Sequence, residues 1–152
     1  MSSGTPAVDS SRGLPGRVLG VDLGARRVGL ALTDPLRMIS SPFSTLPMTS
    51  ESALVGELRG LCLSNAVALV VIGLPVSTDG SEGPGCARSR RIAASLAAEG
   101  LAVELQDESW SSREAEEILR ETGKSRRTER GKVDAIAASL ILSDYLAGAS
   151  RT

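Results

Sequence analysis

The sequence predicts an α/β fold in which a mixed five-stranded sheet, with antiparallel first strands and parallel later strands, is flanked by helices. Two apolar segments near the start, 17–24 and 28–33, are separated by a short turn, which is typical of an antiparallel hairpin. Further apolar runs at 67–72 and 101–106 alternate with segments of helical spacing, which favours parallel pairing. The chain has 152 residues, so we expect a single core.

A disordered N-terminal tail over residues 1–16 and a single domain over 17–148 are expected, because the first residues are rich in Ser, Gly and Pro and show no apolar period. The first strand, RVLGVDLG, and its alternating partner, VGLALTD, are predicted to bend at Gly24 or Ala25. Two prolines then bracket a short third antiparallel strand at 38–41.

The middle of the chain alternates helical and strand patterns. Three leucines at helical spacing predict a helix over 51–63, and the β-branched run 67–72 predicts a strand that is covered on both faces. Pro84 suits the first turn of a helix that continues to about residue 98. A strand over 101–106 follows.

Two helices are predicted in the last third of the chain. Ser111 and Glu114 match a capping box, which predicts a helix over 112–121. The polar and basic segment 122–132 predicts a loop. A last helix is expected over 131–147, and its core-facing residues are predicted to be Val133, Ile136, Ala137, Leu140 and Ile141.

The residue inventory excludes several kinds of site. The chain has no histidine, and its two cysteines, Cys62 and Cys86, lack the CxxC spacing of a zinc or redox site. A Ser-His-Asp triad, a Cys-His pair and a histidine-bound zinc are therefore excluded. Any reaction must depend on carboxylates, hydroxyls, basic side chains or a metal held by oxygen.

Charge and hydropathy indicate no global attraction to nucleic acid or membrane. The formal net charge is −1, so binding to nucleic acid requires a local basic patch. The longest apolar run, 66–72, is far shorter than the roughly 20 residues that cross a bilayer, and the N-terminus lacks a signal-peptide pattern. We expect a cytoplasmic protein with no membrane partner.

Acidic residues stand at three places where a predicted strand ends or a predicted helix starts. Asp22 lies inside the apolar strand GVDLG, where burial of an unpaired charge is costly. Asp107 and Glu108 follow the strand over 101–106, and Asp134 lies in the first turn of the predicted last helix. Each place also has an ordinary explanation, because acids cap turns and favour the first turn of a helix.

Taken together, the three places predict a metal site. Two strand ends and one helix start can converge on a small oxygen-rich site, and Mg²⁺ and Mn²⁺ prefer carboxylate and water ligands. Two such ions about 4 Å apart would activate a water molecule and stabilise the leaving oxygen in phosphodiester hydrolysis. The arrangement therefore predicts a carboxylate site for two divalent ions.

Basic residues gather near this predicted site. The most positive stretch, 120–132, precedes Asp134 and could guide a phosphate backbone toward bound ions. A basic helix face follows the glycine-rich segment 73–84, which could hold an anion, although such faces are often only solvated and such segments are often ordinary turns. The residues predicted to contact nucleic acid are Arg26, Arg27, Arg88, Lys124, Arg126, Arg127, Arg130 and Lys132.

Four segments resemble successive motifs of the YqgF/RuvX family. They are GRVLGVDLGARRVGLALTD, VVIGLPVSTDGSEGP, DES before a Ser-rich helix start, and VDAIAASLILSDYL. The resemblance covers roughly residues 17–147 and keeps the order and spacing of the motifs. Family members are Holliday junction resolvase-like proteins with an RNase H-like fold, described as pre-16S rRNA nucleases. The resemblance implies an RNase H-like sheet and a hydrolase that acts on phosphodiester bonds.

The same resemblance implies which acids form the site. The family's first acid corresponds to Asp22, the second to Glu108 and the third to Asp134, as catalytic residues and ligands of Mg²⁺ or Mn²⁺. The family commonly has an Arg after the Asp-Glu pair, and here Ser109 stands at that position, followed by Trp110. Loss of that guanidinium removes a phosphate contact or a group that orients a carboxylate.

Three functions stay open at this point. The first is a metal-dependent nuclease on structured nucleic acid, which processes the 5′ end of pre-16S rRNA or resolves branched DNA as a homodimer. The second is a sugar-kinase-like ATPase, because the first hairpin also looks like that of actin-like folds, although 152 residues supply one of the two domains that those proteins close over ATP. The third is a non-catalytic nucleic-acid-binding module, which the Ser109 departure keeps open.

Overall fold

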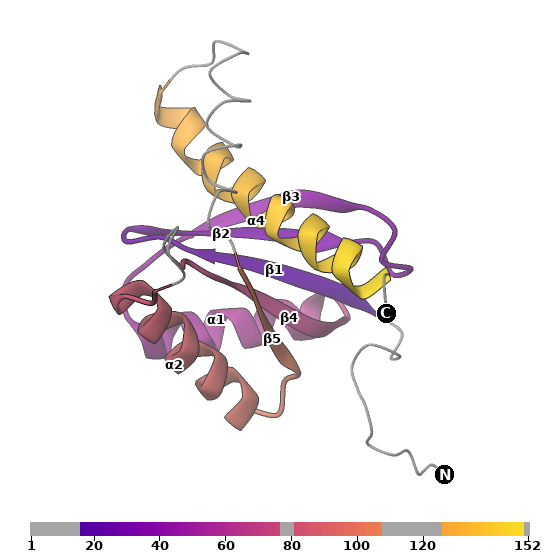
Figure 1. The fold of residues 1–152 in the computed structure, drawn as a ribbon, viewed down its shortest axis with the longest axis horizontal. Coiled ribbons are helices and arrows are strands. Elements are labelled where there is room, and N and C mark those ends of the chain that lie inside the picture. The colour runs from indigo at the N-terminus through magenta and orange to yellow at the C-terminus, as the bar shows by residue number, and fades with distance from the viewer. Residues whose placement is uncertain (1–15, 77–80, 108–125, 151–152) are drawn as a thin grey trace.

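The structure is a computed structural model that describes residues 16–76, 81–107 and 126–150. With the labels of Figure 1, its elements are β1 (Arg17–Leu23), β2 (Arg27–Thr33), β3 (Ser40–Pro47), α1 (Glu51–Ser64), β4 (Val67–Leu74), α2 (Pro84–Ala98), β5 (Val103–Asp107) and α4 (Arg126–Ser150). The five strands form one sheet in the order β3-β2-β1-β4-β5. None of the helices in these ranges is both long enough and apolar enough for a membrane span.

Strand pairing confirms the predicted mixed sheet. β1 pairs antiparallel with β2, and β2 pairs antiparallel with β3. β4 lies parallel to both β1 and β5. The short link between β1 and β2 permits only an antiparallel pair, whereas the links through α1 and α2 are long enough to return the chain for parallel pairing. The carboxyl ends of β1, β4 and β5 therefore lie at one edge of the sheet.

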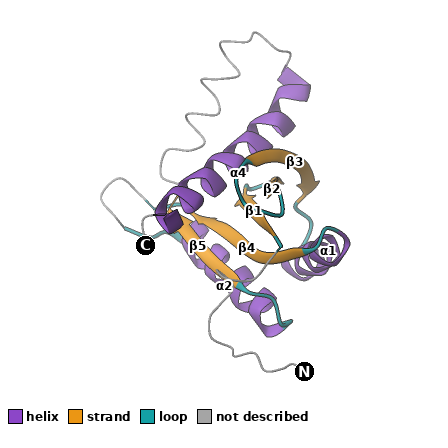
Figure 2. Ribbon diagram, turned by 90° about the vertical axis from the view of Figure 1, so that its right-hand side faces the viewer, coloured by secondary structure: helices purple, strands orange, loops and turns teal. Residues whose placement is uncertain are grey.

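Helices cover both faces of the sheet, with α1 and α2 on one face and α4 on the other (Figures 1 and 2). Alternate residues of β1 face the two layers. Leu19 and Val21 belong to the core under α1 and α2, whereas Val18 packs under α4. The core under α4 contains Val18, Ala31, Leu69, Val71, Ala138, Ile141, Leu142 and Tyr145.

The third strand begins later than predicted. Instead of 38–41 it covers Ser40–Pro47, because residues 34–39 form a tight loop around the Asp34 carboxylate. That carboxylate accepts hydrogen bonds from the backbone N–H groups of Leu36, Met38 and Ile39. A strand that includes prolines is tolerated here because β3 is an edge strand.

The last helix begins earlier than predicted, at Arg126, so the prediction of a loop over 122–132 is wrong for residues 126–132. Arg, Glu and Lys are good helix formers, and a polar helical segment cannot be told from a loop by apolar periodicity. The helix continues to Ser150, beyond the predicted end at residue 147.

The buried face of α4 is also rotated from the predicted face. Ala137 and Ile141 are buried as predicted, whereas Val133, Ile136 and Leu140 are only half-buried. The fully covered positions are Ala137, Ala138, Ile141 and Leu142. The small residues Ala137 and Ala138 let this part of the helix approach the sheet closely, and Ile141 and Leu142 fill the core one turn further along. The predicted helix over 112–121 lies outside the described residues.

Candidate active site

Asp22 lies near the carboxyl end of β1 with only 9% of its surface exposed. It is directly opposite Gly29 of β2 in the antiparallel register. Opposite residues of such a pair project to the same face of the sheet, with Cβ positions about 4.5–5.5 Å apart. Asp22 therefore lies on the face to which a side chain at position 29 would project.

That face is the one covered by α4, at the position of Asp134. A β-carbon built on Gly29 would lie 1.9 Å from the carbonyl oxygen of Asp134 and 2.9 Å from its Cα. The same alternation holds further along β1, where a β-carbon on Gly20 would lie 2.5 Å from Cγ of Leu142. The fold therefore brings Asp22 and Asp134 to neighbouring positions on one face, although they are far apart in the sequence.

The prediction that Asp134 lies in the first turn of its helix is wrong, because α4 already begins at Arg126. The interaction between a carboxylate and the helix dipole falls off within the first turn, so it does not explain an acid at this position. The helix dipole therefore does not account for Asp134, whose side chain is 18% exposed beside the sheet.

Arg27 forms an ion pair with this acid: its Nε donates to Oδ2 of Asp134 over 2.6 Å. Arg27 begins β2, two residues before Gly29, and so projects to the same face of the sheet. The contact draws the Asp134 carboxylate toward the β1–β2 turn, which is also the end of β1 where Asp22 lies.

The third predicted acid, Glu108, lies outside the described residues, as do Ser109 and Trp110. The residue before it, Asp107, ends β5 and pairs with Leu74 of β4 at the sheet edge that holds the carboxyl ends of the parallel strands. Within the described ranges, no group of three or more His, Cys, Asp or Glu side chains is arranged to hold a metal ion. The described part of the candidate site consists of two carboxylates and one guanidinium.

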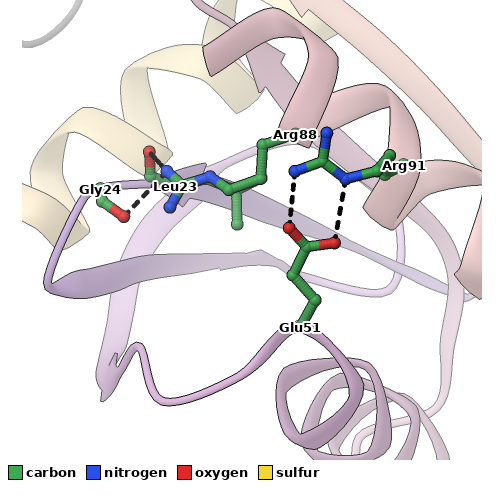
Figure 3. A network of polar contacts seen from close by, with 5 residues as sticks. All are labelled: Leu23, Gly24, Glu51, Arg88 and Arg91. Atoms are coloured by element: carbon green, nitrogen blue, oxygen red, sulfur yellow. Dashed lines mark hydrogen bonds and ion pairs between the residues drawn. The ribbon is translucent and has the colours of Figure 1, made fainter. Parts of the chain in front are cut away.

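Arg88 has a structural role that the sequence did not indicate. Its Nη2 donates to the carbonyl oxygens of Leu23 and Gly24, each over 2.9 Å, and so ties α2 to the end of β1 (Figure 3). Those carbonyls belong to the two residues after Asp22. Arg88 therefore fixes the backbone that carries the first acid, and its predicted contact with nucleic acid stays a prediction.

The other arginines of α2 form ion pairs with acidic residues at the surface. Arg91 forms two hydrogen bonds with Glu51 at the start of α1 (Figure 3), and Arg90 forms two with Glu82. The hydrogen bond from Arg91 holds the pKa of Glu51 below its ordinary value. This face is therefore balanced in charge, as expected for a solvated surface.

The remaining predicted nucleic-acid contacts are distributed between the hairpin and the start of α4. Arg26 is exposed in the β1–β2 turn, beside the candidate site. Four of them, Arg126, Arg127, Arg130 and Lys132, belong to the first two turns of α4, but their side chains lie outside the described part of the structure, and so does Lys124 altogether.

Two glycines that let α4 approach the sheet were not predicted from the sequence. At Gly29 and Gly20, α4 lies so near the sheet that a β-carbon would collide with it, and neither glycine was singled out. A signal was present, because a glycine inside a strand often marks the close approach of another backbone. The periodicity that predicted the strands gave no indication of which helix would approach.

Residues 16–148 match the family described as RuvX, Holliday junction resolvase. Two curated relatives carry the name "Putative pre-16S rRNA nuclease". The one from Chlorobium luteolum is 43% identical over 86% of this chain and 94% of its own, and the one from an Anaeromyxobacter species is 43% identical over 87% and 97%.

Solved structures show the same fold. RuvC of Thermus thermophilus in complex with a Holliday junction substrate matches with a TM-score of 0.54 at 12% identity, over 87% of this chain and 94% of that one. The Fowlpox virus resolvase in complex with junction DNA matches with a TM-score of 0.52 at 11% identity, over 87% and 97%. These matches confirm the RNase H-like fold that the sequence predicted, and the chain belongs to the RuvX family of resolvase-like nucleases.

Proposed function

We propose that this nuclease hydrolyses phosphodiester bonds of structured nucleic acid at Asp22, Asp134 and Glu108, with a pair of Mg²⁺ or Mn²⁺ ions as cofactor. The observation that carries the proposal is the placement of Asp22 and Asp134 at neighbouring positions on one face of the sheet, through the close contact of Gly29 with the backbone of α4. Residues 112 positions apart in the sequence meet there, which places two carboxylates close enough to serve one site.

The donor set fits a hard divalent cation. Both described acids offer carboxylate oxygens, which Mg²⁺ and Mn²⁺ prefer, and the chain has no histidine that would favour a softer metal. Asp22 is 9% exposed, and a buried carboxylate is costly unless a cation or hydrogen bonds compensate it. Asp22 and Asp134 would hold the ions, together with Glu108. When bound, such ions polarise the scissile phosphate and lower the pKa of a coordinated water.

The chain's own residues supply position and charge around those acids. The backbone of β1 is fixed by Arg88 through the carbonyls of Leu23 and Gly24, so Asp22 is held on a rigid strand rather than on a loop. Arg26, exposed in the adjacent turn, is placed to contact a phosphate of the substrate. The basic residues at the start of α4 would extend this contact along the backbone of the nucleic acid.

We assign pre-16S rRNA as the substrate, because the curated relatives at 43% identity are named for a nuclease of this RNA. Processing of its 5′ end is part of the same proposal. A junction in branched DNA is the second candidate, which the family description and the fold of two junction-bound resolvases favour. A homodimer would suit the symmetry of a junction. A cytoplasmic location belongs to the same proposal.

A cleavage assay tests the proposal on both substrates side by side. A precursor 16S rRNA fragment and a four-way DNA junction are incubated with the wild type in Mg²⁺, in Mn²⁺ and in EDTA. We expect cleavage of the RNA that EDTA abolishes and that Asp22→Asn and Asp134→Asn each reduce by about two orders of magnitude or more. Glu57→Gln is the matched control, because it removes one negative charge from exposed α1 on the opposite face of the sheet.

Each alternative has its own result. Cleavage that persists in EDTA contradicts the metal site. Cleavage of the junction alone replaces the assigned substrate with branched DNA. Tight binding of nucleic acid without cleavage in any metal contradicts the nuclease and supports the non-catalytic module that the Ser109 departure left open.

A further inference from the structure

The ion pair between Arg27 and Asp134 occupies an oxygen that the proposed function needs. Nε of Arg27 lies 2.6 Å from Oδ2 of Asp134, and the two side chains are 36% and 18% exposed. A guanidinium stays charged at every accessible pH, so this contact cannot be removed by deprotonation. A cation that binds Asp134 must therefore compete with Arg27 for the carboxylate.

We propose that Arg27 is an exchangeable counter-ion, which neutralises Asp134 when the site lacks a divalent cation and turns to a phosphate of the nucleic acid when the cation binds. The inference rests on the proposed function, because it takes Asp134 as a metal ligand. Arg27 then has two partners in succession, Asp134 and a phosphate. Binding of a cation at the site therefore raises the affinity for nucleic acid.

The position of Arg27 supports the exchange. It starts β2 beside the exposed β1–β2 turn, and about a third of its side chain already faces solvent, so it can leave Asp134 without breaking the core. Its backbone is held independently, because its carbonyl accepts from the N–H of Gly24 over 2.9 Å. A planar guanidinium fork matches phosphate oxygens as well as it matches a carboxylate.

Like charges provide the driving force. With a divalent cation on Asp134, the guanidinium at its present distance would face a like charge across the same carboxylate, whereas a substrate phosphate offers the opposite charge. Binding of cation and nucleic acid is then cooperative in both directions, because a coupling free energy between two ligands is reciprocal.

Cation affinity gives the first test, measured without any reaction. Mn²⁺ is titrated into the wild type, Arg27→Gln and Arg26→Gln, and the bound ion is followed by electron paramagnetic resonance. We expect Arg27→Gln to bind Mn²⁺ about three- to tenfold more tightly than the wild type, since the competitor is gone. Arg26→Gln removes the same charge from the adjacent residue and should stay within about twofold of the wild type. Thermal unfolding in EDTA checks that both variants fold.

Affinity for nucleic acid gives the second test. Binding of the precursor 16S rRNA fragment, and of the four-way junction beside it, is measured in Ca²⁺ and in EDTA for the same three proteins. We expect the loss of affinity caused by Arg27→Gln to be at least about threefold larger in Ca²⁺ than in EDTA, because Arg27 is engaged with Asp134 when no cation is present. The loss caused by Arg26→Gln should be equal in the two conditions.

The outcomes separate this inference from the function on which it rests. If the wild type binds Mn²⁺ and Asp134→Asn does not, the metal site stands. If Arg27→Gln then binds Mn²⁺ no more tightly than the wild type, the exchange is overturned while the metal site is kept. Wild type that binds no Mn²⁺ overturns both. Arg27→Lys is a second variant: it keeps the charge without the planar fork, and we expect Mn²⁺ affinity between those of the wild type and Arg27→Gln.

Discussion

The backbone of α4 at Asp134 lies so close to Gly29 of β2 that no side chain fits between them. This contact sets the depth at which the helix crosses the sheet, and thereby the distance of the third acid from the first. Asp22, opposite Gly29 on the neighbouring strand, shares the face that the contact defines. Gly29 is thus a determinant of the site although it carries no functional group.

Replacement of Gly29 by Ala is expected to displace α4 and to weaken the site. A β-carbon would lie 1.9 Å from a backbone oxygen, which cannot rotate away as a side chain can. Overpacking of this kind costs about 1–3 kcal/mol in the free energy of unfolding. We expect a lower midpoint in urea unfolding and a Mn²⁺ affinity reduced by about tenfold or more.

Gly20→Ala is the matched control for that substitution. Its β-carbon would meet the side chain of Leu142 at 2.5 Å, so it also overpacks the interface with α4, but away from the acids. Gly20→Ala should destabilise the fold with a smaller effect on Mn²⁺ affinity. Equal effects of the two substitutions on Mn²⁺ affinity would contradict a specific role of Gly29.

Replacement of Gly56 by Ala is expected to have the opposite sign. Gly56 lies within α1, is exposed, and a β-carbon there would meet nothing within 4 Å. Alanine is favoured over glycine in a helix interior by about 0.5–1 kcal/mol. Chemical unfolding should show this gain in stability. A loss of stability would mean that the space around Gly56 is not open.

The loop around Asp34 should make stability depend on pH. The hydrogen bond from the backbone N–H of Ile39, followed by those from Met38 and Leu36, holds the pKa of Asp34 below its ordinary value. A lowered pKa in the folded state stabilises the fold above the unfolded pKa of about 3.9, and this contribution is lost as the pH falls through the folded pKa.

Asp34→Asn therefore lacks a contribution that the wild type has at neutral pH. Thermal unfolding of both proteins between pH 7 and pH 2 measures it. We expect the wild type to unfold at the higher temperature at pH 7 and the difference to shrink below about pH 4. A difference that is constant over this range would show that the charge of Asp34 does not matter.

Both cysteines should resist thiol reagents in the folded protein. Cys62 and Cys86 are free and buried. Burial raises the pKa of Cys62 to about 11, so its thiolate, the reactive form, is scarce at pH 8. With a chromogenic disulfide we expect slow labelling of the native protein and rapid labelling of both thiols in denaturant. Rapid native labelling would mean that the layer of α1 and α2 opens readily.

The sequence predicted the mixed sheet because hairpins and β-α units leave local signals. It did not predict where α4 begins, because the polar segment 126–132 has no apolar face to reveal a helix. It placed Arg88 among the nucleic-acid contacts because its charge is visible in the sequence, whereas its acceptors are two backbone carbonyls at the end of a distant strand.

The candidate site was predicted only in part for the same reason. Asp22 and Asp134 stand out because one interrupts an apolar strand and both fit a family motif. The partner of Asp134 does not stand out, because Arg27 is 107 residues away and only the packing of α4 brings them together. The close approach at Gly29 is likewise a property of two distant elements, which local patterns do not record.

If Asp22 and Asp134 bind the same divalent ion, their contributions to Mn²⁺ affinity depend on each other, and a double-mutant cycle measures that dependence. Titration of wild type, Asp22→Asn, Asp134→Asn and the double variant gives the coupling between the two acids. We predict that each single substitution weakens binding by about tenfold or more and that the double variant is hardly weaker than the worse single one. Fully additive losses, or single variants that bind Mn²⁺ like the wild type, would show that the two acids do not share an ion.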